Sequence, residues 1–250
     1  MAYPFKKLFT KAYSLYVYLL ALILLIPLGP FVFVFSFFSK LKSGNLIYSA
    51  CHIYAKVWFV LSGVRYKELN TPPFLHGQPY VFIANHTSYL DVLCLLRAIN
   101  QPVRALGKQE MGNIPIFGFF YKKAVVTVDR SSLGTRAQSL VHLKKYLARG
   151  ISIFVFPEGT FNETNKPLKS FYDGAFRIAI EMQIPIQPIL FLDNNKRMNN
   201  GGSFNLTPGK CRVIYLDLIP VDRLSIRQTA DLKLKVYQVM ENGLLQKDMA

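Results

Sequence analysis

The sequence predicts an α/β fold: one domain with a mostly parallel central sheet flanked by helices, preceded by an N-terminal membrane helix or helical hairpin. Three observations carry this prediction. Short apolar runs alternate with amphipathic stretches from residue 79 onward, residues 15–38 contain no charged side chain, and polar residues directly follow three of the apolar runs. In a chain of 250 residues, we place a membrane-anchoring segment at 1–62 and one folded domain at 63–250, which is long enough for a sizeable core.

The predicted strands are short and apolar, as expected for strands that are buried on both faces. They lie at residues 81–84, 103–106, 125–128, 151–156, 186–191 and 212–216. Helices are predicted between them, at residues 91–97, 135–148, 172–182 and 229–245. The alternation of strand and helix is typical of a parallel sheet in a single domain. Residues 194–209, which are rich in Asn and Gly, predict a loop.

The uncharged segment 15–38 is long enough to span a bilayer, because about 20 apolar residues suffice. Pro27 and Pro30 interrupt its middle, so a kinked span and a re-entrant hairpin are both possible. Basic residues on both flanks give no orientation by charge, and they slightly favour the hairpin: Lys6, Lys7, Lys11, Lys40 and Lys42.

A second apolar stretch, residues 46–61, carries His52 and Lys56. It is short for a membrane span. We therefore expect an interfacial helix, or a helix packed on the first one.

The formal net charge of +16 and the isoelectric point near 9.8 predict anionic partners. Nucleic acid, anionic lipid and an acidic substrate all match such a charge. Lys and Arg are scattered, and no zinc-finger or RNA-binding signature is present, which disfavours nucleic acid. The three cysteines form no CxxC pair, which fits a reducing compartment, and Cys94 lies in an apolar run where a buried thiol is expected.

The first polar cluster is Asn-His-Thr-Ser-Tyr-Leu-Asp at 85–91, directly after the strand 81–84. Ser88 or Thr87 is suited to cap the next helix. One helical turn then brings the carboxylate of Asp91 back toward the imidazole of His86, where it can fix the tautomer and stabilise the imidazolium. The alternative is a histidine at a helix start with Asp91 as a solvated first-turn acid.

Two further clusters follow strands. Phe-Pro-Glu-Gly-Thr at 156–160 exposes a carboxylate and main-chain N–H groups, although an ordinary glycine turn has the same pattern. Val-Asp-Arg at 128–130 offers Arg130 as a bidentate phosphate ligand, or as half of a surface ion pair. Because the carboxyl ends of parallel strands share one edge, all three clusters are expected to face one crevice.

Four blocks in this order resemble the glycerolipid acyltransferase family, specifically the 1-acyl-glycerol-3-phosphate acyltransferases. The resemblance runs from about residue 60 to 219. Its blocks are His-x4-Asp at His86 and Asp91, Val-Thr-Val-Asp-Arg at 126–130 (preceded by residues 108–111 and 114–118), Glu-Gly-Thr at 158–160, and Ile-Pro-Ile-Gln-Pro at 184–188.

The resemblance implies that 63–250 is a catalytic domain in which His86 removes the proton of an acceptor hydroxyl, and Asp91 orients His86. The acceptor attacks the thioester of acyl-CoA or acyl carrier protein, with no cofactor and no metal. It further implies a cell or inner membrane location, with the domain facing the cytoplasm on an anionic surface. The implied substrate-binding residues are Lys108, Arg130, Glu158, Gly159, Thr160 and Lys169.

The sequence departs from the family at three places. The usual Arg after Glu-Gly-Thr is Phe161, the usual downstream Lys is Tyr172, with Lys169 nearby as a substitute, and Ala124 stands near the usual Gly. The acceptor is therefore open: lysophosphatidate, or another lysolipid or an aminoacyl lipid. Two other hypotheses remain, a hydrolase using Ser88 with His86, which lacks a GxSxG elbow, and a non-catalytic lipid-binding module.

Overall fold

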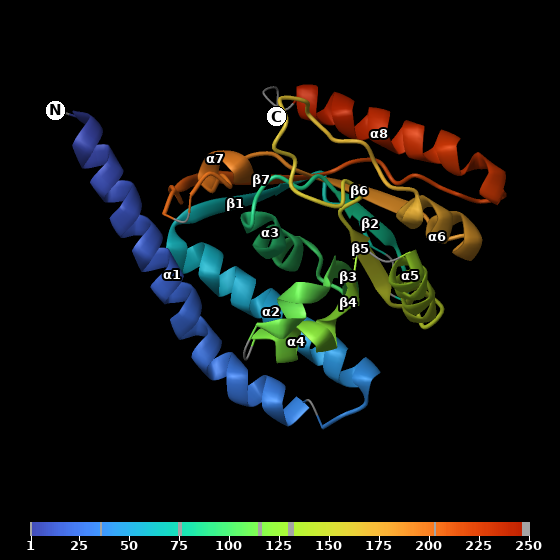
Figure 1. Cartoon of the computed structure of the whole chain (residues 1–250), viewed down its shortest axis with the longest axis horizontal. Helices are drawn as coiled ribbons and strands as arrows, with labels where there is room; N and C mark the ends of the chain where they lie inside the picture. The colour runs from blue at the N-terminus through green and yellow to red at the C-terminus, as the bar shows by residue number, and fades with distance from the viewer. Residues whose placement is uncertain are drawn as a thin grey trace.

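The computed structural model describes residues 2–35, 37–74, 77–114, 117–129, 133–202 and 204–246. Within them, seven strands form one sheet in the order β1-β7-β6-β2-β5-β3-β4 (Figure 1). The strands are β1 (Val64–Leu69), β2 (Val81–Ala84), β3 (Val103–Lys108), β4 (Val125–Val128), β5 (Ser152–Val155), β6 (Ile186–Phe191) and β7 (Gly209–Tyr215). The mostly parallel sheet predicted from the sequence is confirmed.

Only the β6–β7 pair is antiparallel among the pairings of this sheet, and β1 runs parallel to β7. The five remaining strands, from β6 to β4 in the sheet order, therefore run in the same direction. Their carboxyl ends lie along one edge of the sheet. In open α/β sheets this edge is where ligands bind. It is also where the polar clusters of the sequence leave the sheet.

Helices cover both faces of the sheet. Side chains of a strand alternate between faces, so Phe82 and Ile83 are both fully buried but belong to different apolar clusters. One face is covered by α1 (Ala2–Phe35), α2 (Lys40–Ser62) and α3 (Leu90–Ala98). The other is covered by α5 (Leu133–Leu147), α6 (Gly174–Met182) and α8 (Thr229–Leu245). Shorter elements are the 3-10 helices Gln109–Asn113 and Ile226–Gln228 with α4 (Phe117–Ala124) and α7 (Asn194–Arg197).

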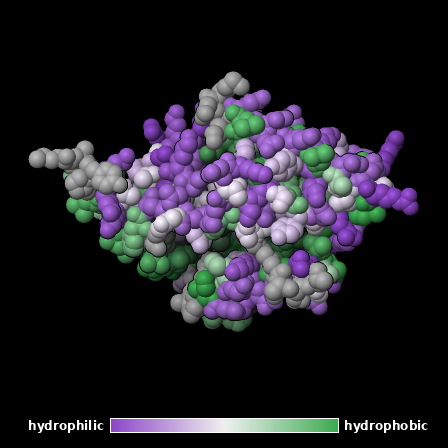
Figure 2. Space-filling model, turned by 45° about the horizontal axis from the view of Figure 1, so that its top comes forward, coloured by the Kyte–Doolittle hydropathy of each residue, from purple (hydrophilic) through white to green (hydrophobic). Residues whose placement is uncertain are grey.

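The N-terminal segment forms one continuous helix, α1, through Pro27 and Pro30. The re-entrant hairpin within residues 15–38 is therefore wrong. Each proline removes a single backbone donor, and long apolar helices tolerate such losses. By length and composition, Phe5–Phe35 is the one candidate membrane span among the described residues. Figure 2 shows hydrophobic residues gathered along the flank that α1 forms.

The second apolar stretch lies in α2, which packs against α1, as one of the two alternatives predicted. The Tyr54 hydroxyl donates a hydrogen bond to the Ala21 carbonyl of α1, 3.1 Å away. The Tyr13 hydroxyl of α1 donates in turn to the Ser62 carbonyl, 2.8 Å away. Trp58 of α2 is buried in the same cluster as the sheet. Because α2 covers the sheet, the helical segment 1–62 and the domain 63–250 share a core; their division as functional units stays a prediction.

Besides the two 3-10 helices, three elements of the described chain were not predicted from the sequence: β1, α4 and α7. β1 reads Val-Arg-Tyr-Lys-Glu-Leu, and its charged side chains are tolerated because it is an edge strand. α4 is a short amphipathic helix without a clear start signal. The loop predicted at 194–209 begins with one helical turn, α7, and its last residue starts β7. The predicted helix 172–182 starts two residues later, at Gly174.

Candidate active site

Asn85 directly follows β2 and begins the loop that leaves the sheet. Its side-chain amide donates to the Phe191 carbonyl, 3.0 Å away, and accepts from the Phe191 main-chain N–H at 2.8 Å. These two bonds extend the pairing of β2 with β6 by one residue, with the Asn85 side chain in place of main-chain groups. His86, the next residue, is therefore held at the carboxyl edge of the sheet.

The imidazole of His86 and the carboxylate of Asp91 form a close pair. His86 Nδ1 lies 2.9 Å from Asp91 Oδ2, and Asp91 is fully buried on α3. The same oxygen accepts the main-chain N–H groups of Thr87 at 2.7 Å and Ser88 at 2.9 Å. The local turn foreseen in the sequence thus forms, and the solvated first-turn acid is excluded by the burial of Asp91.

An ionised carboxylate only accepts hydrogen bonds, so the proton of the imidazole resides on Nδ1 and the lone pair on Nε2. Within the described part of the chain, Nε2 of His86 has no hydrogen-bond partner. The side chain of His86 keeps 16% of its surface exposed. A histidine held in this way can take a proton from a ligand that reaches Nε2.

Aromatic rings enclose the imidazole of His86. Phe156 stacks on it with ring centroids 3.8 Å apart and planes 10° apart. Phe161 contacts it at 4.2 Å and a 47° tilt, and the Tyr89 ring packs against Phe161 at 4.8 Å. Phe161 stands where the family resemblance places an Arg, so the site has an apolar ring in place of a cation next to the base.

Glu158 is bound to the main chain of two other segments. One carboxylate oxygen accepts the N–H of His86 and the other that of Lys169, each at 2.8 Å. The side chain is 2% exposed. Burial raises the pKa of Glu158 to about 7, although the two N–H groups and the nearby Lys169 oppose the shift. Glu158 therefore fixes the geometry of the loop that carries His86.

The turn after Glu158 requires glycine. Gly159 has a φ of +75°, and a Cβ at this position would lie 2.6 Å from Cε2 of Tyr172. Tyr172, at the place of the usual family Lys, is exposed and closes over this turn. An apolar cavity of about 260 Å³ opens here, between the turn and helices α5 and α6.

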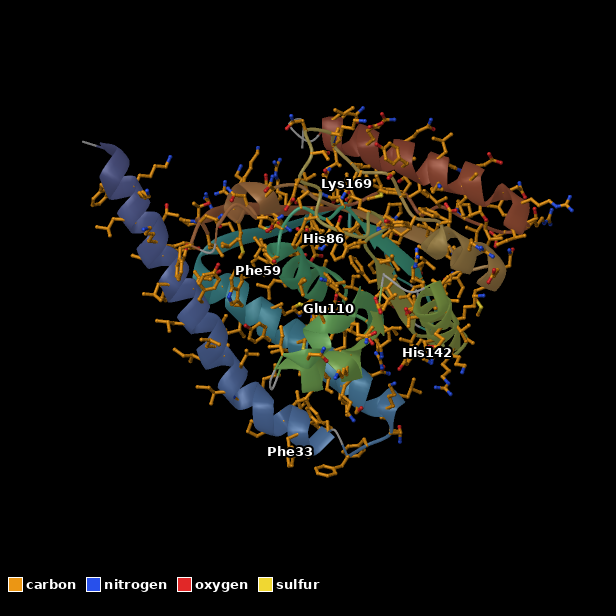
Figure 3. All side chains as sticks on the ribbon, in the orientation of Figure 1. Phe33, Phe59, His86, Glu110, His142 and Lys169 are labelled. Carbon is orange, nitrogen blue, oxygen red and sulfur yellow. The ribbon has the colours of Figure 1, made fainter. Side chains whose placement is uncertain are left out.

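Three of the remaining predicted ligands, Lys169, Thr160 and Lys108, lie at the same sheet edge with different surroundings. The ammonium of Lys169 donates to Thr160 Oγ1, 2.7 Å away, and this pair is exposed. Lys108, at the end of β3, is exposed and forms an ion pair of 3.3 Å with Glu110. Arg130 lies outside the described residues. Figure 3 shows His86 and Lys169 close together at the sheet edge, with His142 away from them on α5.

Hydrogen bonds thus join His86, Asp91, Glu158 and Lys169. In the part of the chain that the structure describes, Lys108 pairs with Glu110 and makes no hydrogen bond to these four residues. The order β2-β5-β3-β4 places the strand ends that precede His86, Glu158 and Arg130 along one edge, with that of Lys108 between the last two. Among the described residues, no group of three or more His, Cys, Asp or Glu side chains has the arrangement of a metal site.

Segment 198–206 connects the site with α1. The Ser88 hydroxyl donates to the Met198 carbonyl at 2.6 Å, and the Asn200 amide donates to the Thr87 carbonyl at 3.2 Å. At the other end of the segment, the Leu206 main-chain N–H donates to the buried Ser14 hydroxyl of α1 at 3.0 Å. Ser88 is fully buried in this role, which contradicts its use as a hydrolase nucleophile.

Sequence reasoning missed Asn194, whose side-chain amide donates to Asp91 Oδ1 at 2.6 Å. It also missed the rings of Phe156 and Phe161 against the base. A signal for Asn194 was present, because it closely follows β6, and residues after parallel strands meet at one edge.

Known proteins are similar to this chain in sequence or in fold. A 1-acyl-sn-glycerol-3-phosphate acyltransferase from Arabidopsis thaliana chloroplasts is 30% identical over 168 residues, 65% of this chain and 47% of that protein. The human 1-acyl-sn-glycerol-3-phosphate acyltransferase beta is 26% identical over 195 residues, 75% of this chain and 69% of that protein. The chain thus spans about half the length of the plant relatives it matches.

A solved structure, that of the 1-acyl-sn-glycerophosphate acyltransferase PlsC from Thermotoga maritima, superposes with a TM-score of 0.81 over 98% of both chains at 20% identity, so it shares the fold. A family model described as Acyltransferase matches residues 43–192, which include His86, Asp91 and Glu158. Since that match covers more than half of its length, the chain belongs to the acyltransferase family.

Proposed function

We propose that the protein transfers a fatty acyl group from acyl-CoA or acyl carrier protein to the free hydroxyl of 1-acyl-glycerol-3-phosphate, giving phosphatidic acid for phospholipid synthesis. The observation that carries the proposal is the bond of 2.9 Å between His86 Nδ1 and the buried Asp91. Relatives named as 1-acyl-sn-glycerol-3-phosphate acyltransferases support the choice of acceptor.

The proposed reaction uses His86 as a general base. Nε2 accepts the proton of the acceptor hydroxyl while the hydroxyl oxygen attacks the thioester carbonyl carbon. Asp91 stabilises the imidazolium that forms. Collapse of the tetrahedral intermediate breaks the carbon–sulfur bond, and the departing thiolate takes the proton back from Nε2. The acyl donor is a co-substrate, and the reaction needs no resident cofactor.

The acceptor phosphate is proposed to lie against the exposed cations at the sheet edge. Lys169 is the best supported, because its ammonium and Thr160 lie beside the Glu158 turn. Arg130 and Lys108, at the ends of the two strands beyond, are further proposed ligands, as is the Gly159 main chain. The apolar cavity beside Gly159 offers space of the right polarity for an acyl chain.

The membrane is the proposed place of reaction. α1 presents large exposed apolar side chains such as Leu22, Ile23 and Ile26, and the net charge of +16 suits an anionic lipid surface. We propose that α1 anchors the chain in the cell or inner membrane with the catalytic domain on the cytoplasmic side.

A second acceptor class follows from Phe161. An apolar ring against His86 in place of a cation favours an acceptor without a phosphate at that point, such as another lysolipid or an aminoacyl lipid.

The test is an acyl-transfer assay with the full chain in phosphatidylglycerol-containing vesicles. It crosses acyl-CoA and acyl carrier protein with lysophosphatidate, lysophosphatidylglycerol and lysophosphatidylcholine. His86→Ala is expected to abolish transfer, and His142→Ala, an exposed histidine on α5, to leave it unchanged. Transfer by His86→Ala at the wild-type rate contradicts the proposal. Preference for lysophosphatidylcholine would support the second acceptor class. Lipid binding without turnover would instead support a non-catalytic binding module.

A further inference from the structure

The carboxylate of Asp91 is hydrogen-bonded very unevenly. Its Oδ2 accepts three bonds, from the His86 imidazole and from two main-chain N–H groups. Its Oδ1 accepts one bond, from Nδ2 of Asn194 at 2.6 Å. Asp91 and Asn194 are both fully buried. Among the described residues, Asn194 is therefore the single partner that the structure gives to the second oxygen of a buried carboxylate.

Chemistry fixes the orientation of the Asn194 amide. A carboxylate can only accept, so the NH2 group of the amide must face Asp91 and its oxygen must face away. On that side, the amide oxygen accepts the thiol of Cys211 at 2.9 Å. The sulfur of Cys94 lies within hydrogen-bonding distance of both amide atoms, 3.2 Å from Nδ2 and 3.4 Å from the oxygen. Burial raises the pKa of the Cys94 thiol well above its usual value, which keeps this sulfur protonated and able to donate.

The main chain at Asn194 is held by its neighbour. Asp193 accepts the main-chain N–H of Arg212 at 3.1 Å and two guanidinium bonds of 2.9 and 3.0 Å from the same residue. Asn194 then begins α7 at the carboxyl edge of the sheet, with Asp91 and Cys94 one turn apart on α3. The side chain of Asn194 thus ties the end of β6 to the helix that carries Asp91.

From this geometry we propose that Asn194 is a positioning residue for the acyl transfer, acting on His86 through Asp91. The inference rests on the function proposed above. Its bond to Oδ1 sets the rotation of the carboxylate, and this rotation places Oδ2 against Nδ1 of His86. Without the bond, a buried carboxylate oxygen loses its donor, so the carboxylate is expected to rotate or shift until Oδ1 meets another donor, which changes the contact between Oδ2 and the imidazole.

Kinetics of two variants test the proposal. Asn194→Ala removes the donor, and Asn194→Asp keeps the shape but presents an oxygen to Oδ1. Both are expected to lower kcat by about 10- to 100-fold, as loss of a supporting hydrogen bond does in other sites, with KM values within about threefold of wild type. The control is Asn45→Ala in α2, which removes a hydrogen-bond partner of the buried Arg104 in β3 and is expected to change stability without changing kcat.

A double-variant cycle separates positioning from general stability. In an Asp91→Ala background, Asn194→Ala should lower kcat by less than about twofold, because the side chain through which it acts is gone. A loss as large as in the wild-type background overturns the proposal. So does a wild-type kcat for Asn194→Asp in a folded protein, as judged by circular dichroism and the thermal midpoint.

A readout without turnover distinguishes this inference from the proposed function. Proton NMR of the full chain in detergent micelles, with 15N-labelled histidine, detects the hydrogen-bonded Nδ1 proton of His86, assigned by its loss in His86→Ala. The resonance should shift or vanish in Asn194→Ala and persist in Asn45→Ala. An unchanged resonance in Asn194→Ala refutes the positioning role of Asn194, even when the wild type transfers acyl groups. If the wild type transfers acyl groups to no acceptor, the proposed function is refuted. The resonance still tests whether Asn194 positions the Asp91–His86 pair.

Discussion

Glu158 is bonded to the main chain of His86 and not to its side chain. One oxygen of the carboxylate accepts the His86 N–H at 2.8 Å, and the other accepts the Lys169 N–H at the same distance. The carboxylate thus joins the loop after β2 to the segment before α6. In the proposed reaction, its role is to hold His86 and Lys169 in a fixed relation.

Replacing Glu158 with Gln should lower activity although the shape is kept. The amide has one acceptor oxygen, so its NH2 group must face the N–H of His86 or of Lys169. We expect a cost of about 1–3 kcal/mol in unfolding free energy and a fall in kcat of at least about tenfold. Thermal unfolding and acyl-transfer rates measure both. Glu163→Gln, an exposed change in the same loop, serves as the control, and equal behaviour of the two variants would refute the bracing role.

The stability of the protein should fall as pH rises through 7 because of the same residue. Burial raises the pKa of Glu158 from 4.5 to about 7, so the folded state holds a proton that the unfolded state releases. This contribution is complete below pH 4.5 and is lost above pH 7. Between pH 5.5 and 8.5 the wild type should lose about 2 kcal/mol more than Glu158→Gln. Urea unfolding of both proteins at the two pH values measures the difference, and parallel curves contradict the shift.

Gly159→Ala should destabilise the turn after Glu158. The φ of +75° is unfavourable for a residue with a Cβ, and the new methyl would lie 2.6 Å from the Tyr172 ring. We expect a loss of about 1–3 kcal/mol in unfolding free energy. Gly202→Ala is the matched control, since its Cβ would meet nothing closer than 3.9 Å. Adding Tyr172→Ala to Gly159→Ala should recover only the steric part of the loss, and full recovery would show that φ is not strained.

Phe161→Arg should change the choice of acceptor. The side chain lies 4.2 Å from the His86 ring, so a guanidinium here adds a cation beside the reacting hydroxyl. We expect kcat/KM for lysophosphatidate relative to lysophosphatidylcholine to rise by about tenfold, the effect of about 1.4 kcal/mol of added phosphate binding. Phe161→Met gives a neutral side chain of similar length. An equal shift in the Met variant would mean that loss of the ring, and not charge, sets the preference.

The sequence was sufficient for the parts of the site that are local. His86 and Asp91 lie five residues apart across one turn, and β2 and β5 are apolar runs with no competing interpretation. The mostly parallel sheet also follows from the alternation of strands with helices, whereas the order of the strands was not predicted. Edge strand β1 was missed because its alternating charges resemble a loop. The continuity of α1 was left open because a proline can either kink a helix or end it.

Interactions between segments that lie far apart in the sequence could not be predicted. The partners of Glu158 are main-chain N–H groups, which every residue carries, so no residue type marks them. Asn194 was assigned to a loop, and its role depends on a side-chain bond to a residue more than a hundred positions earlier. The rings around His86 likewise came from separate positions whose apolar character predicts burial and no more.

Segment 198–206 links helix α1 to the loop that carries His86, since it bonds to Ser14 of α1 near one end and to Thr87 near the other. In the proposed arrangement, with α1 in the membrane, the height of the imidazole above the bilayer surface would be set by how deeply this helix inserts. The proposed transferase would then select acceptors by how far their free hydroxyl projects from the leaflet, before any contact with their headgroup is made.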